Sequence, residues 1–279
     1  MRKSVLGVVL LVAVQTASAA IKYEFHQTLS SDMDGAQQTD CSGKAVIDGE
    51  KSRVEFINCN VYPPGSYVLT TNGSRVLTFV DPGKKSYADV NAGAVAAALG
   101  STKISINNRK VNLTEMSDHP VIAGIPTDHV RLAIDYDITV TFGTIPLTQS
   151  VHTLIDRWTT QAFGDVAETF LSGGALRTGN ADIDDLVAAE NAKGKGFPMR
   201  QTVRTTTINN RAGAVKSALS VNRMVTITRE LTVSSIDPVA RIAASTFDVP
   251  VGFHRADPLK DDTQKAPMQI LSMEPSGKS

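Results

Sequence analysis

The residues best placed for chemistry are a histidine and two aspartates on one stretch of the chain. His129, Asp135 and Asp137 alternate with apolar residues, so an extended strand would present all three side chains on one face. A carboxylate that orients an imidazole can make a general base. His129 and Asp135 are six residues apart, which is about 20 Å along a strand. The spacing therefore favours polar residues on the wet face of a sheet over a catalytic pair.

Two acidic segments carry residue types that bind cations. The run Asp32-Met33-Asp34-Gly35 resembles part of a calcium-binding loop, but the last ligand position of that frame holds Cys41 instead of glutamate. An acidic surface turn is the simpler interpretation. The second segment begins at Ala181, and its acidic residues are Asp182, Asp184, Asp185 and Glu190. Negative charge is favourable at a helix N-terminus, so this pattern predicts a solvated helix start and no metal site.

The sequence motifs of common enzymes are missing. The chain has no Gly-x-Ser-x-Gly elbow, no His-Glu-x-x-His zinc motif, no phosphate-binding loop and no Gly-x-Gly-x-x-Gly turn. We therefore expect no enzyme and no cofactor, with an unrecognised hydrolase as the weakest alternative. Four late arginines could contact anionic headgroups at a cavity mouth, although charge pairing on a sheet surface is the simpler interpretation. They are Arg200, Arg204, Arg223 and Arg229.

The first residues have the pattern of a secretory signal peptide. Arg2 and Lys3 precede an apolar run, Val5–Val14, and an Ala-x-Ala cleavage site ends at Ala19. The run is too short to span a bilayer, which disfavours the alternative of a membrane anchor. No cysteine lies at the cleavage point for lipidation. We expect a mature protein without a membrane span, free in the periplasm or secreted.

The two cysteines fit an oxidising compartment. Cys41 and Cys59 flank two strand-like segments, Gly43–Ile47 and Arg53–Ile57, which a five-residue loop would join. In that register Val46 faces Val54, and the two cysteines fall opposite each other, close enough to bridge. We therefore predict a structural disulfide, with two buried free thiols as the alternative.

The composition describes a globular protein and excludes one class of partner. Hydrophobic residues make up 42% of the chain, and 28 basic residues balance 28 acidic ones. A binder of nucleic acid needs clustered lysine and arginine to contact phosphates, so nucleic acid is not expected. The sequence does not predict the oligomeric state.

Period-two alternation of apolar residues dominates the chain, which predicts strands. Residues 43–90 read as a five-strand antiparallel meander, in which Asn72-Gly73 and Asp81-Pro82-Gly83 make turns. Val90–Leu99 is rich in alanine and predicts a short helix. A second hairpin is predicted from Lys103–Ile106 and Arg109–Leu113.

The clearest strand follows Pro126 and is unusually long. Its apolar positions, expected to be buried, are Val130, Leu132, Ile134, Tyr136, Ile138, Val140 and Phe142, whereas Arg131, Asp135 and Asp137 should lie on the other face. Further strands are predicted at Leu147–Trp158, Met199–Ile208 and Leu219–Ser234, with helices at Ala162–Leu171 and Ala181–Ala192, the latter capped by Asn180. Strands of this length must bend. The fold class is therefore mainly β (α+β), a single strongly curved antiparallel sheet with a few helices over its concave face.

The stretch Ser52–Tyr87 resembles a known family. Its Ser-Arg-Val-Glu-Phe strand, its Asn-Gly hairpin and its Asp-Pro-x-Lys-Lys-Ser-Tyr turn are similar to the LolA-like superfamily of periplasmic lipoprotein carriers, and more closely to uncharacterised members. Later segments, Ala123–His129 and Phe247–Phe253, resemble those members too. The resemblance implies a half-barrel with an apolar cavity for acyl chains, in which Arg53 stands where an arginine of the carriers controls lipid release.

Together these patterns predict an exported, non-enzymatic binding protein for a lipid or another apolar ligand. The domain would cover residues 20–253, and a disordered polar tail residues 254–279. Phe163, Phe170 and Leu186 on the two helices should face the cavity beside Arg53. The alternative is an envelope interaction or sensor module that binds another protein through its sheet.

Overall fold

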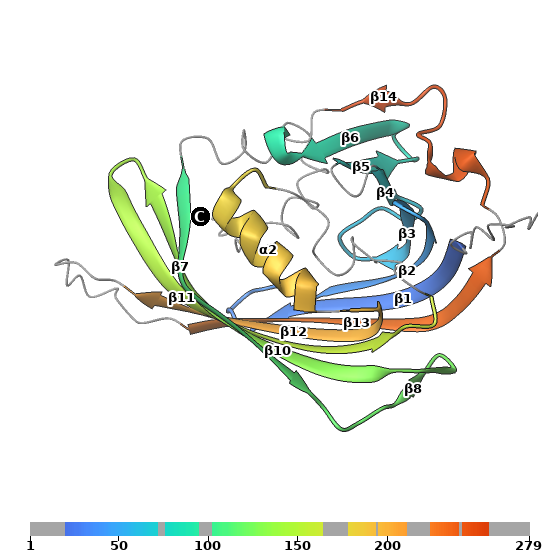
Figure 1. Cartoon of the computed structure of the whole chain (residues 1–279). Coiled ribbons are helices and arrows are strands. Elements are labelled where there is room, and N and C mark those ends of the chain that lie inside the picture. The colour runs from blue at the N-terminus through green and yellow to red at the C-terminus, as the bar shows by residue number, and fades with distance from the viewer. Residues whose placement is uncertain are drawn as a thin grey trace, which may run out of the picture.

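A computed structural model describes residues 20–71, 76–94, 102–163, 178–193, 195–210, 224–239 and 242–256. Within these ranges the chain is mainly β, and twelve strands form one sheet in the order β14-β6-β5-β4-β3-β2-β1-β13-β12-β11-β10-β7 (Figure 1). Every neighbouring pair is antiparallel except β14 and β6. The sequence thus predicted the fold class at the level of one large antiparallel sheet. The expected signal peptide lies outside the described residues.

The predicted five-strand meander is formed by β2 (Thr39–Asp48), β3 (Lys51–Cys59), β4 (Tyr67–Thr71), β5 (Val76–Asp81) and β6 (Ser86–Asn91). It is preceded by β1 (Ala20–Ser31), a strand that was not predicted from the sequence. The helix expected at Val90–Leu99 begins later, because Val90 and Asn91 belong to β6, and within this segment residues 92–94 are the described helical residues.

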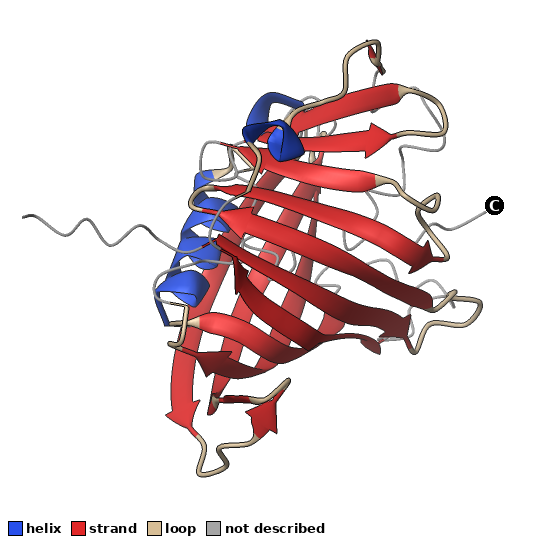
Figure 2. Ribbon diagram, turned by 90° about the vertical axis from the view of Figure 1, so that its right-hand side faces the viewer, coloured by secondary structure: helices blue, strands red, loops and turns tan. Residues whose placement is uncertain are grey.

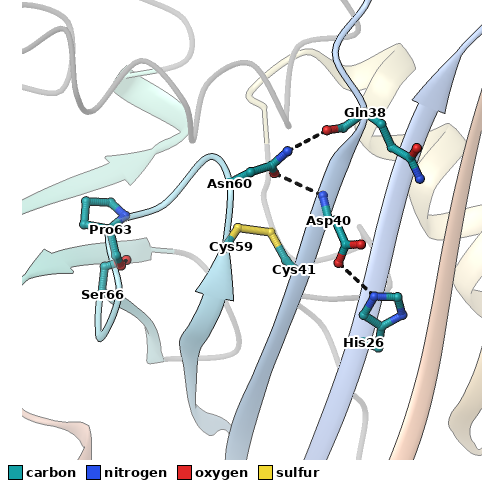
Figure 3. Close-up of a disulfide and its surroundings, with 8 residues drawn as sticks. All are labelled: His26, Gln38, Asp40, Cys41, Cys59, Asn60, Pro63 and Ser66. Atoms are coloured by element: carbon teal, nitrogen blue, oxygen red, sulfur yellow. Dashed lines mark hydrogen bonds and ion pairs between the residues drawn. A yellow bond between two sulfur atoms is a disulfide. The ribbon is translucent and has the colours of Figure 1, made fainter.

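The register between β2 and β3 differs from the prediction by one residue. Asp48 pairs with Lys51, so the turn has two residues instead of five, and Val54 faces Ala45 instead of Val46. A bulge beside Gly43 then restores the predicted pairing of Cys41 with Cys59. The two cysteines form a disulfide with a Cα–Cα distance of 4.1 Å (Figure 3).

Longer strands form the other half of the sheet. They are β7 (Lys103–Glu115), β10 (Asp128–Phe142), β11 (Ile145–Thr160), β12 (Phe197–Asn210) and β13 (Met224–Val239). The hairpin predicted within β7 is wrong: the strand is continuous and carries a bulge. Asp135 pairs with Lys110 but Asp137 pairs with Asn107, and Asn108 takes a positive φ of 56° inside the bulge. The Asn-Asn pair therefore marks a bulge and not a turn.

The smaller elements lie on opposite sides of the sheet. Figure 1 shows α2 (Ala181–Lys193) on one side and the hairpin of β8 (Val121–Ile122) and β9 (Ile125–Pro126) on the other. We call these sides the helix face and the outer face. The asymmetry is also visible in Figure 2, where the blue helix lies along one side of the red sheet.

The main core lies on the helix face, where aromatic residues of β1 and the meander meet residues of β12 and β13. Phe25, Phe56, Phe197, Met199 and Leu231 are among its buried members. On β10, Leu132 and Ile134 are buried as predicted, whereas Val130, Tyr136, Ile138 and Val140 are only half-buried. The side chain of Phe142 is not among those that the structure describes.

A second, smaller core covers the outer face of the meander. Tyr67, Leu69 and Val80 are buried there against Val249 and Phe253, which follow the short helix η1 (Ala244–Phe247).

The chain then runs parallel to β6 as β14 (His254–Arg255). The first residues of the expected polar tail thus belong to the sheet, whereas residues 257–279 lie outside the described part of the chain.

Candidate functional site

On one half of the helix face the side chains are buried in the main core, and on the other half several are only partly buried. Several apolar residues of β10, β12 and β13 share the face of the main core, yet all of them stay half-buried. We call these residues the aliphatic strip; they are Ile138, Val140, Val203, Val225 and Ile227. Thr205 of β12 and Thr153 of β11 lie on the same face, between the apolar residues of β13 and those of β10. Half-buried apolar surface of this kind in a folded protein is typical of a ligand or partner site.

Helix α2 lies over the β7 side of this face and is held there by polar contacts at its N-terminus. Asp182 accepts a hydrogen bond from the backbone N–H of Ile106 at 3.1 Å, and Asn180 Nδ2 donates to the carbonyl of Ile104 at 3.0 Å. Asn180 Oδ1 also accepts from Ile183 N–H at 3.2 Å, which confirms the predicted cap. These bonds satisfy part of the otherwise unpaired edge of β7.

The rest of α2 packs loosely. Leu186 contacts the cluster of Leu132, Ile134 and Ile155, but no side chain of α2 with a described burial is fully buried. Helix α2 therefore rests on the sheet through partly buried contacts and does not form part of the dry core.

A buried polar pair lies on the helix face beneath α2. Arg157 of β11 and Gln201 of β12 are cross-strand neighbours, and their exposed fractions are 4% and 1%. Arg157 Nε donates to Gln201 Oε1 at 3.1 Å, and Arg157 Nη2 pairs with Glu190 of α2 at 3.3 Å. Burial raises the pKa of Glu190, and the positive charges of Arg157 and Arg229 oppose the rise.

The structure places the predicted site residues on both faces of the sheet. Phe163 packs edge-on against Phe197, with ring centroids 5.9 Å apart, so it lies on the helix face with Leu186. Arg53 lies on the outer face, since its neighbours Ser52 and Val54 are buried on the helix face. Arg53 is therefore not brought together with the other predicted residues, and Phe170 lies outside the described residues.

Arg53 instead borders an open groove of about 360 Å³ on the outer face. Its guanidinium stacks on Tyr67, 3.7 Å from the ring centroid, and pairs with Glu55 at 3.2 Å. The groove lies between the meander and residues 242–246; it is lined by Lys22, Lys44, Val46, Arg53, Glu55, Ile242, Ala243 and Thr246.

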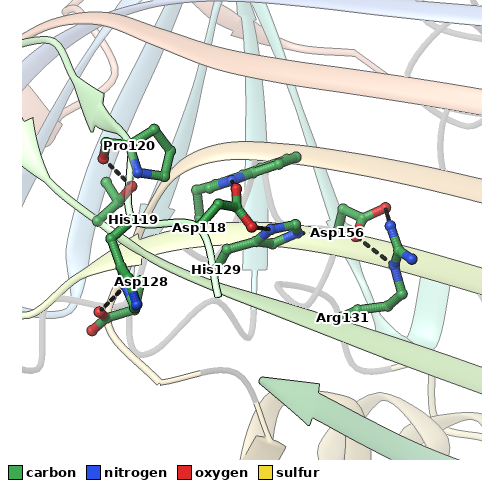
Figure 4. Close-up of polar contacts among 9 residues, drawn as sticks. Asp118, His119, Pro120, Asp128, His129, Arg131 and Asp156 are labelled. Carbon is green, nitrogen blue, oxygen red and sulfur yellow. Dashed lines mark hydrogen bonds and ion pairs between the residues drawn. The ribbon is translucent and has the colours of Figure 1, made fainter. Parts of the chain in front are cut away.

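A histidine cluster occupies the outer face near the β8–β9 hairpin (Figure 4). His129 does not pair with Asp135, as the spacing indicated, and is buried between Asp118 and Asp156, at 2.6 and 3.0 Å. Its ring stacks on Trp158, with centroids 4.1 Å apart. Arg131 donates two hydrogen bonds to Asp156, at 2.7 and 3.1 Å. These tight contacts leave no open substrate position beside the imidazole, so the cluster is structural.

The described residues include no group of three or more His, Cys, Asp or Glu side chains arranged to hold a metal ion. At the segment that resembles a calcium loop, Asp32 Oδ1 accepts from Thr226 N–H at 2.8 Å, and Cys41 is in the disulfide. Among the helices of the described ranges, none has the length and apolar character needed to cross a membrane.

No family model matches the chain, and no curated protein matches its sequence. Among solved structures, the chain is similar to an uncharacterized conserved protein from Thermus thermophilus, with a TM-score of 0.37 and 7% identity over 86% of this chain and 90% of that one. It is also similar to a LolA superfamily protein from Nitrosomonas europaea, with a TM-score of 0.30 and 9% identity over 83% of this chain and 90% of that one. This second protein is from the superfamily that the motifs predicted. Neither similarity says what this chain binds, so the proposals below rest on its own residues.

Sequence reasoning missed the polar pair on the helix face. Arg157 and Gln201 are 44 residues apart, and both lie in strands with weak alternation. The signal that could have found them is polar residues at positions whose neighbours two residues away, Ile155 and Met199, are apolar.

Proposed function

We propose that the chain is an exported, non-enzymatic binding protein that holds an apolar ligand on the helix face, within a half-barrel cavity covered by α2. The observation that carries this proposal is the aliphatic strip, which is half-buried although it continues the face of a dry core. A ligand chain lying along the strip would remove this apolar surface from water, and each buried CH₂ would contribute about 0.8 kcal/mol.

The loose packing of α2 supports a ligand that enters beneath the helix. Because the contacts at the N-terminus of α2 are to the edge strand β7, the helix can tilt without breaking the sheet. The disulfide supports a periplasmic or secreted location, since such bonds persist in oxidising compartments.

An environment-sensitive neutral dye such as Nile red tests the proposal. We expect saturable binding that weakens about tenfold when Leu186 is changed to glutamate, because the new charge would lie against the apolar cluster of β10 and β11. Ala188→Glu is the matched control, since Ala188 is exposed on the same helix. A folded protein that binds neither dye nor lipid would favour the alternative, an interaction module that docks another envelope protein.

A further inference from the structure

Strand β7 ends the sheet, and half of its outer edge is open. It is the last strand in the sheet order and pairs with β10 on one side. Near its start, the contacts of Asn180 and Asp182 cover the other side. Beyond the bulge at Asn108, no described residue pairs with the outward side of residues 109–115. We call residues 109–115 the open edge.

The backbone of the open edge presents hydrogen-bonding groups that β10 does not use. Met116 N–H donates to the carbonyl of His129 at 2.9 Å, so Met116 faces β10. The hydrogen-bonding direction alternates along an antiparallel strand, so the N–H and C=O groups of Val111, Leu113 and Glu115 face away from β10. Another strand can therefore pair with this edge without displacing β10.

The side chains of the open edge complement a second copy of the same segment. If two copies pair antiparallel about Asn112, Val111 of each lies opposite Leu113 of the other, and these residues carry the outward backbone groups. Leu113 is 37% exposed and Val111 is half-buried, so their contact would remove apolar surface from water. At the ends of the segment, Arg109 would lie opposite Glu115, which are both exposed and opposite in charge.

This register is better than its neighbours. A shift of two residues keeps the backbone bonds, but it places Arg109 opposite Leu113 in one direction and Glu115 opposite Val111 in the other. Basic residues and bulges also protect edge strands from pairing. Here the bulge at Asn108 lies before the open edge, and the charges at the two ends attract a second copy.

We propose that the open edge is a self-association surface, through which two copies of this chain join their sheets antiparallel about Asn112. The pairing ends at Arg109, short of the part of β7 that Asn180 and Asp182 cover. So short a contact is typical of weak, reversible association.

A single cysteine at the centre tests the register. Residue 112 of each copy would face the other in a non-hydrogen-bonded pair, with Cα atoms about 4.5 Å apart, which a disulfide can bridge. The two native cysteines are bonded to each other, so Asn112→Cys adds the only free thiol. We expect mild oxidation to give a covalent dimer. Thr114→Cys is the matched control on the same face of the strand, and it should give about tenfold less, because Lys110 lies opposite it in this register.

Sedimentation velocity tests association without a cross-link. We expect the purified chain to pass from monomer to dimer as its concentration rises. Arg109→Glu places like charges opposite each other and should raise the dimer Kd about tenfold. Adding Glu115→Arg to that variant should restore the Kd. Lys51→Glu is the control, because it makes the same charge change at an exposed position of β3.

Two results would overturn the proposal: equal cross-linking at positions 112 and 114, or a folded chain that sediments as a monomer up to millimolar concentration. Neither result bears on ligand binding at the helix face, because the open edge includes no residue of α2 or of the aliphatic strip.

Discussion

At the scale of single residues, two buried polar clusters differ in whether their hydrogen-bonding groups have partners. In the histidine cluster of the outer face, both ring nitrogens of His129 contact carboxylates and Trp158 Nε1 donates to Asp118. On the helix face, Gln201 Nε2 has no hydrogen-bond partner within the described ranges. Satisfied clusters rigidify a fold, whereas an orphaned buried donor is a place for a ligand.

Asp156 joins His129 and Arg131 and should be important for stability. Burial alone would raise its pKa, but hydrogen bonds from Arg131 and His129 outweigh burial and hold the pKa below its usual value. A carboxylate with a lowered folded pKa stabilises the protein above its unfolded pKa of about 3.9, and this contribution is lost as the pH falls through the folded value.

We therefore expect Asp156→Asn to reduce the free energy of unfolding by about 1–3 kcal/mol at neutral pH. The difference from the wild-type chain should shrink as the pH falls below about 4. Urea denaturation at neutral pH and at a pH below about 4 measures this loss of unfolding free energy. Asp128→Asn, at an exposed carboxylate, is the control. An equal loss at both pH values would contradict the role of the ionised carboxylate.

At the scale of elements, the sequence predicted most strands but not their register. Alternation identified most of β2–β6 and β10–β13 because these strands have one wet and one dry face, whereas β4 is buried on both faces. It misplaced Val46 by one residue, since a five-residue and a two-residue turn both fit Asp48–Ser52. It mistook the bulge at Asn108 for a turn, because asparagine accepts a positive φ in either setting. It also could not place Arg53, whose face depends on which neighbours are buried.

Gly43 lies beside the bulge between β2 and β3, where neighbouring atoms come too close for any larger residue. A Cβ atom there would lie 2.1 Å from the carbonyl oxygen of Glu55 and 2.8 Å from the ring of Phe25. Gly43→Ala should therefore lower the free energy of unfolding by about 2 kcal/mol or more, because the backbone must shift. Thermal unfolding compares it with Gly83→Ala, where the nearest atom is a carboxylate oxygen of Asp81 at 3.3 Å. If Gly43→Ala left the free energy of unfolding unchanged, β2 could not lie as close to Glu55 and Phe25 as the structure places it.

The one-sided character of β10 can be tested at adjacent positions. Ile134 is buried on the helix face, and Asp135 pairs with the exposed His152 on the outer face. Ile134→Asp should destabilise the fold by about 3 kcal/mol or more, because it buries an unpaired charge. Asp135→Asn should cost less than about 0.5 kcal/mol. Chemical denaturation measures both changes, and equal effects would overturn the assignment of the two faces.

At the scale of the whole molecule, the sequence could not predict how distant segments close the sheet. β1 pairs with β13, so strands from the two ends of the domain lie side by side at its centre. Such long-range pairing depends on tertiary packing, for which local alternation gives no signal. The candidate site has the same origin: Arg157, Glu190 and Gln201 come from three elements, and only the assembled sheet brings them together.

The described C-terminal segment packs on the outer face of the meander. Val249 and Phe253 cover Tyr67, Leu69 and Val80, and Ala256 N–H donates to the carbonyl of Tyr87 at 2.7 Å. A chain that stops at Ala256 keeps these contacts, so its free energy of unfolding should match that of the full chain within about 0.5 kcal/mol. A chain that also lacks residues 242–256 exposes this outer core and should lose about 3 kcal/mol, since two large apolar side chains no longer pack. Guanidinium denaturation of the three chains measures the difference. If stopping at Ala256 cost as much as the longer deletion, part of residues 257–279 would have to belong to the folded domain.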